Sequence, residues 1–199
     1  MAETTRRKVS TSVLKGKKRR GQKITMLTAY DYPMASFIDK AGVDVILVSD
    51  AVGTVGNGRP EAVSVTVDEM IYHTQAVRNG AEHSMVVTTL PFGSYNSIDD
   101  AVRNATRLMK EGKADGVHLE GTHKSGVLIR AIVSNGIPVM GHIGITKQKI
   151  VHSGLFRLPG RNADTAKEMI TDALEMADSG AFALVLECLP IRLAEIITR

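Results

Sequence analysis

Three short apolar runs of this 199-residue chain each end in a carboxylate. They close at Asp50 in ILVSD, at Glu120 in GVHLE and at Glu187 in LVLE. Carboxylate oxygens are ligands that Mg²⁺ prefers, and a carboxylate can also act as a general base. Acids at the carboxyl ends of buried strands therefore predict a metal-assisted site at one end of a parallel barrel. A fourth run, MVVTTLPF, has Thr89 where this pattern leads us to expect another acid.

The first two acids each have a structural alternative. Asp50 could bind a hard cation, or it could cap a helix or turn. Glu120 could be a second ligand, direct or through water, or an ion-pair partner of Lys124. His118 lies two residues before Glu120, so the two side chains point to the same side of one strand and could share a site.

The last two apolar runs offer a candidate base and a candidate pocket histidine. Glu187 stands between Leu186 and Cys188, a setting in which poor solvation would raise the pKa of the carboxyl group. A buried structural ion pair is the alternative for Glu187. His142 in GHIG could be catalytic or a satisfied core histidine. Cys188, the single cysteine, excludes an intrachain disulfide and is predicted to be a small buried apolar residue.

The elements that must position these side chains form a repeating pattern. Nearly continuous apolar runs alternate with helical patterns, which is typical of parallel strands covered on both faces. The runs are 24–31, 44–50, 84–91, 116–121, 138–144 and 183–190. The prediction is an α/β fold of the (β/α)8 TIM-barrel type with about six βα units present. A closed eight-stranded barrel needs two more units.

Helix and loop signals agree with this alternation. Thr66 and Glu69 form a capping-box pattern, Ser97 is a candidate N-cap, and another helix is predicted from about 164 to 179. Two long connections, 51–65 and 145–162, follow strand ends, where barrels place lids and substrate-binding loops.

Charge divides the chain into two predicted parts. Residues 1–23 hold nine basic residues against one acid, a charge of +8, whereas 24–199 hold 16 basic and 20 acidic residues, a charge of −4. We predict a flexible basic leader over 1–23 and the barrel domain over 24–199. The leader has no aromatic residue, so nucleic-acid binding is not expected. A cytoplasmic protein without membrane spans is predicted, and organelle targeting by the leader is the alternative.

Several segments, taken in order, closely resemble the ketopantoate hydroxymethyltransferase family over about residues 17–199. They are TAYDYPMA (28–35), VILVSDAVG (45–53), VTVDEMIYHTQAVRNGA (65–81), LPFGSY (90–95), GVHLEG (116–121), GHIGIT (141–146), GLFRLPGR (154–161) and LVLECLP (184–190). The resemblance implies an eight-stranded (β/α) barrel assembled into a homo-oligomer, a decamer in the family.

The resemblance also implies an activity. Family members transfer a hydroxymethyl unit from 5,10-methylenetetrahydrofolate to 3-methyl-2-oxobutanoate, giving 2-dehydropantoate (ketopantoate) for pantothenate and coenzyme A biosynthesis. Mg²⁺ would chelate the 2-oxo acid and stabilise its enolate. By motif position, Asp50 matches a metal ligand, Glu120 the acid near the metal and Glu187 the proton acceptor. His142 matches the pocket histidine.

Three positions depart from the family pattern, and all concern oxo-acid and metal binding. The usual GDS reads Ser49-Asp50-Ala51, which loses a serine that helps to hold the substrate carboxylate. Thr89 replaces the usual second acid, which is a metal ligand in the family. His118, a partial cation near neutral pH, replaces a lysine. The predicted substrate contacts are thus Asp50, Ala51, Thr89 and His118. A homologue that uses another 2-oxo acid, or a non-catalytic assembly partner, is the alternative.

Overall fold

The computed structural model describes residues 6–121, 125–145 and 158–199 and contains one six-stranded parallel sheet. The strands follow one another in sequence order, each paired with the next. Their bounds are β1 Met26–Thr28, β2 Val45–Val48, β3 Met85–Thr89, β4 Gly116–Glu120, β5 Val139–Gly144 and β6 Ala183–Glu187. All six lie within the ranges that the apolar runs predict.

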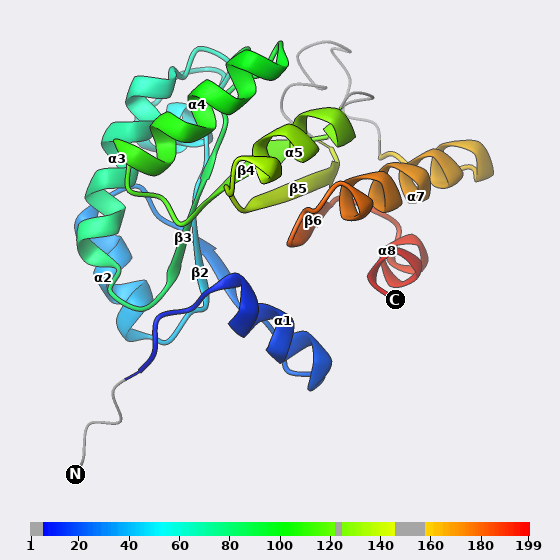
Figure 1. The fold of residues 1–199 in the computed structure, drawn as a ribbon, viewed down its shortest axis with the longest axis horizontal. Helices are drawn as coiled ribbons and strands as arrows, with labels where there is room; N and C mark the ends of the chain where they lie inside the picture. Colours follow the sequence, from blue (N-terminus) through cyan, green and yellow to red (C-terminus); the bar gives the residue numbers. More distant parts are fainter. Residues whose placement is uncertain (1–5, 122–124, 146–157) are drawn as a thin grey trace.

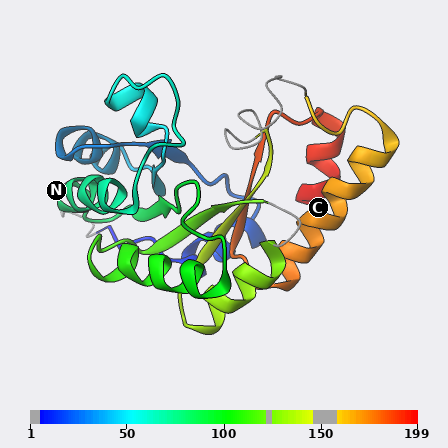
Figure 2. The same cartoon turned by 90° about the horizontal axis from the view of Figure 1, so that it is seen from above.

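Helices accompany the strands of this curved sheet, and all but the first run along its outside (Figures 1 and 2). They are α1 Thr11–Arg19, α2 Tyr32–Lys40, α3 Val67–Gly80, α4 Ile98–Lys110, α5 Ser125–Ser134, α7 Ala163–Asp178 and α8 Ile191–Thr198, with a π-helical turn η1 at Val52–Gly56. From α2 to α8 each helix packs against the next, so the sheet and its helices form a half-barrel. The six predicted βα units are confirmed, and closure into eight strands stays a prediction.

Strand burial explains the near-continuous apolar runs. Every residue of β2, β3, β4 and β5 is buried. One face, which includes Ile46 and Val48, packs with the helices in the larger core. The opposite face, which includes Val45 and Leu47, forms a second apolar cluster inside the half-barrel. The two end strands are less covered: β1 is exposed and β6 is half-buried.

Local sequence signals set the helix starts. The hydroxyl of Thr66 accepts from the backbone N–H of Glu69, whose carboxylate accepts from the N–H of Thr66, which confirms the capping box. The hydroxyl of Ser97 caps α4 by accepting from the N–H of Asp100. α7 begins one residue before the predicted start, with Asn162 as its cap.

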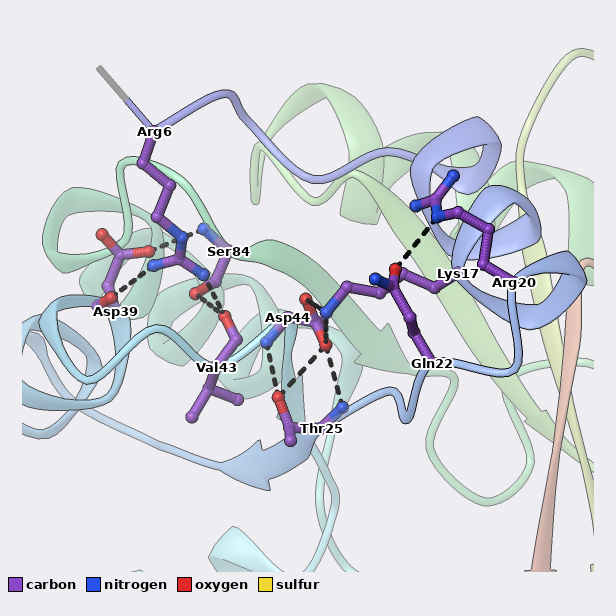
Figure 3. A network of polar contacts seen from close by, with 9 residues as sticks. All are labelled: Arg6, Lys17, Arg20, Gln22, Thr25, Asp39, Val43, Asp44 and Ser84. Carbon is purple, nitrogen blue, oxygen red and sulfur yellow. Dashed lines mark hydrogen bonds and ion pairs between the residues drawn. The ribbon is translucent and has the colours of Figure 1, made fainter. Parts of the chain in front are cut away.

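The basic N-terminal segment differs from the flexible leader that its composition predicts. Residues 11–19 form α1, and Leu14 is buried with Val9 in the apolar cluster inside the half-barrel. Arg6 donates to the carbonyl oxygens of Asp39 and Val43, and Lys17 donates to both carboxylate oxygens of Asp44 (Figure 3). Charge composition misses this packing because two buried aliphatic side chains and specific acid partners outweigh the mutual repulsion of the basic residues.

The loop 51–65 has defined structure, as its glycines and proline suggest. A Cβ at Gly53 would lie 2.6 Å from the side chain of Val65, so only glycine fits this close approach. Arg59 forms an ion pair with Glu69 at the start of α3, and this contact lowers the pKa of Glu69 to about 2. Most of the other long connection, residues 146–157, lies outside the described residues.

No helix in the described part of the chain is long and apolar enough to cross a membrane.

Candidate functional site

The alternation of side chains along each strand places most of the predicted site residues on the inner face. On β3, Met85 and Val87 belong to the inner apolar cluster, so Thr89 continues the same face. On β4, Val117 and Leu119 pack into the outer core, which directs the alternating His118 and Glu120 inward.

The next two strands follow the same rule. Met140 belongs to the inner cluster on β5, and Ala183 and Val185 pack against that cluster on β6. His142 and Glu187 therefore lie on the inner face as well. The carboxyl ends of four consecutive strands thus carry polar side chains above an apolar interior.

Contacts link these side chains across the strands. The hydroxyl of Thr89 lies 3.0 Å from Nδ1 of His118, and the rings of His118 and His142 have centroids 5.2 Å apart. Nε2 of His142 lies 3.1 Å from a carboxylate oxygen of Glu187. The structure therefore brings together four residues that are far apart in the sequence.

Burial makes this polar layer unusual. Five of the predicted site residues are each at most 5% exposed: Asp50, Thr89, His118, Glu120 and His142. Buried polar groups are costly unless they make hydrogen bonds or bind a ligand. Nε2 of His118 has no hydrogen-bond partner among the described residues. This arrangement is typical of a binding site and not of a stability core.

The charge of His118 differs from the sequence prediction. Burial, with a smaller contribution from neighbouring His142, lowers the pKa of His118 to about 3. The side chain is therefore neutral near pH 7, and the prediction of a partial cation is wrong. The pattern could not reveal this, because the desolvation of His118 comes from strands and helices distant in the sequence.

The environment of Glu187 also differs from the prediction. Its side chain is 55% exposed, so the expected poor solvation is wrong, and Cys188 is exposed as well. Glu187 ends β6 and Cys188 follows it, and β6 lies at an end of the sheet with no further strand beside it in the described part of the chain. An apolar neighbourhood in sequence does not bury a residue at a sheet end. The contact of Glu187 with His142 nevertheless keeps it beside the inner polar layer.

The carboxylates at the strand ends could offer a metal ion such as Mg²⁺ only a few protein ligands. Within the described ranges, no three His, Cys, Asp or Glu side chains gather in a way that could hold a metal ion. Mg²⁺ often takes only one or two carboxylates and completes its shell with substrate and water oxygens. Asp50 and Glu120, both buried near the carboxyl ends of their strands, fit that demand. Thr89 offers a hydroxyl, which is a weaker ligand than a carboxylate.

Ala51 and two neighbouring hydroxyl groups lie near the end of β2. Ala51 contributes no polar side-chain atom, and its backbone N–H donates to the hydroxyl of Ser49 over 3.2 Å. The hydroxyls of Ser49 and Tyr30 lie 3.1 Å apart. Our sequence reasoning did not assign these two residues to the site. The sequence feature that could have identified Ser49 is the alternation of side chains along β2, which puts Ser49 on the same face as Val45 and Leu47.

Comparisons with known proteins agree with these features. A sequence model of the family described as ketopantoate hydroxymethyltransferase matches residues 8–199. The chain is 50% identical over 194 residues to 3-methyl-2-oxobutanoate hydroxymethyltransferase of Moorella thermoacetica, covering 97% of this chain and 72% of that protein. It is 49% identical over 183 residues to the protein of the same name from Clostridium botulinum, with coverage of 92% and 66%. The chain thus spans about two thirds of the length of these relatives.

Solved structures support the fold. 2,3-Dimethylmalate lyase, a member of the PEP mutase/isocitrate lyase superfamily, matches with a TM-score of 0.68 and 16% identity, covering 95% of this chain and 67% of that chain. Phosphonopyruvate hydrolase in complex with oxalate and Mg²⁺ matches with a TM-score of 0.66 and 12% identity, with coverage of 90% and 63%. At such low identity these matches establish a shared half-barrel architecture and nothing about substrates.

Proposed function

This chain belongs to the ketopantoate hydroxymethyltransferase family, and on that basis we propose that it acts in the transfer of a hydroxymethyl group to 3-methyl-2-oxobutanoate. The one-carbon unit would come from 5,10-methylenetetrahydrofolate, and the product would be 2-dehydropantoate, a precursor of pantothenate. The observation that supports this proposal most is the row of Thr89, His118, His142 and Glu187 across four strand ends. Two buried acids accompany it, Glu120 at the end of β4 and Asp50 two residues after the end of β2.

The proposed reaction needs a base, and Glu187 is the candidate. Its carboxylate would take the proton from C3 of the oxo acid to give the enolate. Water would hydrolyse the methylene bridge of the folate, breaking both of its carbon–nitrogen bonds to release tetrahydrofolate and a formaldehyde equivalent. The enolate carbon would attack the carbonyl carbon of that formaldehyde, whose oxygen takes up a proton and becomes the hydroxyl group of the product. His142 contacts the Glu187 carboxylate, so it would orient the base.

A divalent cation completes the proposed chemistry. Bound Mg²⁺ would supply Lewis acidity to the ketone and carboxylate oxygens of the substrate. Asp50 and Glu120 are the residues that would hold it, and both are already withdrawn from solvent. Burial matters because electrostatic attraction is stronger where bulk water is excluded. Thr89 weakens this donor set, so we expect a lower Mg²⁺ affinity than three acids would give.

The first chemical step can be tested without the folate. The protein is incubated with Mg²⁺ and 3-methyl-2-oxobutanoate in D₂O, and deuterium incorporation at C3 is followed by proton NMR. We expect exchange well above that of a Glu187→Gln variant, which keeps the size of the side chain and loses its basicity. Exchange at the same rate in both proteins would contradict the proposal.

A further inference from the structure

The backbone of Cys188 adopts a left-handed conformation directly after the proposed base. Its φ is 54°, and apart from glycines Lys113 is the one other residue in the described part of the chain with a positive φ, of 60°. This region costs free energy for a residue that has a Cβ atom, and it persists only where the surrounding structure holds it. The Cys188 side chain is exposed, so its packing does not explain the conformation. The explanation lies in the neighbouring residues.

The packing of β6 shows what the turn at Cys188 does. Leu186 packs against the outer core and Val185 against the inner cluster, as alternation along a strand requires. An unbroken strand would place Leu189 on the inner face together with Glu187. Leu189 packs against the outer core instead. The left-handed residue between them therefore breaks the alternation, and Glu187 is the last side chain of β6 on the inner face.

The neighbouring strand β5 holds the backbone of Glu187. Gly144 is the register partner of Glu187, and the N–H of Ile145 donates to the carbonyl oxygen of Glu187 over 3.2 Å. The φ of Gly144 is 129°, and a Cβ atom at this position would overlap that same oxygen, so only glycine allows the approach. The backbone of Glu187 is thus held by β5 at its side and by the turn that follows it.

This backbone directs the Glu187 side chain along β5. His142 pairs with Val185, so it lies two residues before the position opposite Glu187. The opposite residue is Gly144, which has no side chain to stand between them. The carboxylate reaches Nε2 of His142 at 3.1 Å although the side chain is 55% exposed. An exposed carboxylate on a mobile backbone would occupy many positions, so holding it in one place lowers the entropy cost of reaching the reacting atom.

We propose that the left-handed backbone at Cys188 holds the carboxylate of Glu187 beside His142, so that Cys188 is a positioning residue for the base. The thiol itself takes no part. The inference rests on the proposed function, because it takes Glu187 to accept the C3 proton. A base acts only within hydrogen-bond reach of the proton that it removes, and a misplacement of about 1 Å can lower a rate on the order of a hundredfold.

The test places proline at position 188, because its ring fixes φ at about −65° and excludes the left-handed region. The backbone N–H of Cys188 donates no hydrogen bond to another described residue, so the substitution removes none. Deuterium exchange at C3 is measured at increasing concentrations of 3-methyl-2-oxobutanoate with saturating Mg²⁺. We expect Cys188→Pro to lower the maximal rate at least about tenfold and to leave the half-saturating concentration within about threefold.

A second background tests whether Cys188 acts through the base. Glu187→Gln already lacks the basic group, so adding Cys188→Pro to it should cause no further loss of exchange. A merely structural effect of proline would lower the residual exchange in this background as well.

Three control variants separate the backbone from the thiol and from general strain. Cys188→Ala removes the thiol and Cys188→Gly also removes the Cβ, and both should exchange within about twofold of the unchanged chain because the left-handed region stays accessible. Lys113→Pro makes the same backbone change at an exposed residue before β4, at the amino ends of the strands, and should leave both exchange parameters unchanged. Circular dichroism and a thermal melt verify that each variant is folded. Cys188→Val replaces Cys188→Pro if the latter is not folded, since a β-branched residue strongly disfavours a positive φ.

Each outcome decides the proposal. A maximal rate within about threefold of the unchanged chain in folded Cys188→Pro, or in the valine variant that replaces it, would overturn the positioning role and leave the proposed function standing. The same conclusion would follow from an equal loss in Lys113→Pro or Cys188→Ala, or from a further loss in the Glu187→Gln background. If the unchanged chain exchanges no faster than Glu187→Gln, the proposed function itself fails and the inference falls with it.

Discussion

At the amino ends of the strands Asp44 accepts hydrogen bonds from Lys17 and Thr25, whereas at the carboxyl ends Nε2 of His118 has no hydrogen-bond partner among the described residues. Both side chains are at least 95% buried. The charge of Asp44 is satisfied by partners within the protein, whereas Nε2 of His118 is left for a ligand. Buried polar groups therefore stabilise the structure at the amino ends of the strands, and we propose that those at the carboxyl ends bind the substrate.

The amino end is closed by α1, which packs apolar residues inside the half-barrel and basic residues around it (Figure 3). Asp39 lies in the same region and accepts from the backbone N–H groups of His83 and Ser84. Barrel proteins place their chemistry at the carboxyl ends of the strands, and features at the opposite end are usually for stability. The variants below test that division, from the largest expected effect to the smallest.

Leu14→Ala should have the largest effect on stability. Leu14 is buried in the inner apolar cluster with Val9, and a buried leucine replaced by alanine loses transfer energy and leaves a cavity. We expect the free energy of unfolding to fall by about 3 kcal/mol. Urea denaturation followed by circular dichroism measures it. A loss no larger than that of Val13→Ala, which is less buried, would show that α1 does not close the barrel interior.

Asp44→Asn should lower the free energy of unfolding by about 2 kcal/mol, because Lys17 loses the carboxylate that neutralises it in a partly buried setting. Asp68→Asn is the control, since Asp68 also pairs with an arginine, Arg107, but is well exposed. Its loss should be much smaller. Equal losses in the two variants would contradict a special role for Asp44.

The same residue predicts a dependence on pH. Burial raises the pKa of Asp44, but hydrogen bonds from Lys17 and Thr25 outweigh it and hold the pKa below its ordinary value. The stabilising contribution is therefore complete above about pH 4 and is lost as the pH falls through the lowered pKa. Stability measured from pH 6 to pH 2 should fall less steeply in Asp44→Asn than in the unchanged chain. Parallel curves would contradict this linkage.

At the carboxyl ends of the strands, Thr89→Asp should raise the affinity for Mg²⁺ about tenfold, because a carboxylate is a better ligand than a hydroxyl. Thr89 is almost fully buried on the inner face of β3, so the new acid would enter the polar layer. Calorimetric titration with MgCl₂ measures the affinity. An unchanged value would show that position 89 does not face the metal.

The smallest stability effect is expected for the double variant Thr89→Val/His118→Leu. Replacing both members of a buried hydrogen-bonded pair with apolar groups is often neutral, and here it also removes Nε2 of His118, which has no hydrogen-bond partner within the described ranges. We expect the free energy of unfolding to stay within about 1 kcal/mol or to rise. A loss comparable to that of Asp44→Asn would erase the difference between the two ends.

Sequence reasoning recovered the architecture because its signals are local. The apolar runs, the capping box at Thr66 and Glu69, and the N-cap at Ser97 depend on near neighbours, and all three are confirmed. The grouping of Thr89, His118, His142 and Glu187 followed from their positions at strand ends, because parallel strands bring equivalent ends together.

The burial and charge of individual side chains were harder to predict, because they depend on residues distant in the sequence. The neutrality of His118 and the exposure of Glu187 follow from what surrounds β4 and β6. The docking of α1 depends on a fit between Leu14 and the barrel interior that charge composition does not report. The Tyr30–Ser49 pair joins two strands and was missed because neither residue is a usual metal ligand or base.

One measurement tests the division between the two ends most directly. 3-Methyl-2-oxobutanoate with saturating Mg²⁺ is titrated into the unchanged chain, into Asp44→Asn and into Thr89→Val/His118→Leu, each at a temperature where all three are folded. We predict that Asp44→Asn binds with unchanged affinity and that the double variant binds at least about tenfold more weakly. Equal affinities in all three proteins, or weaker binding by Asp44→Asn alone, would contradict the assignment of binding to the carboxyl ends of the strands.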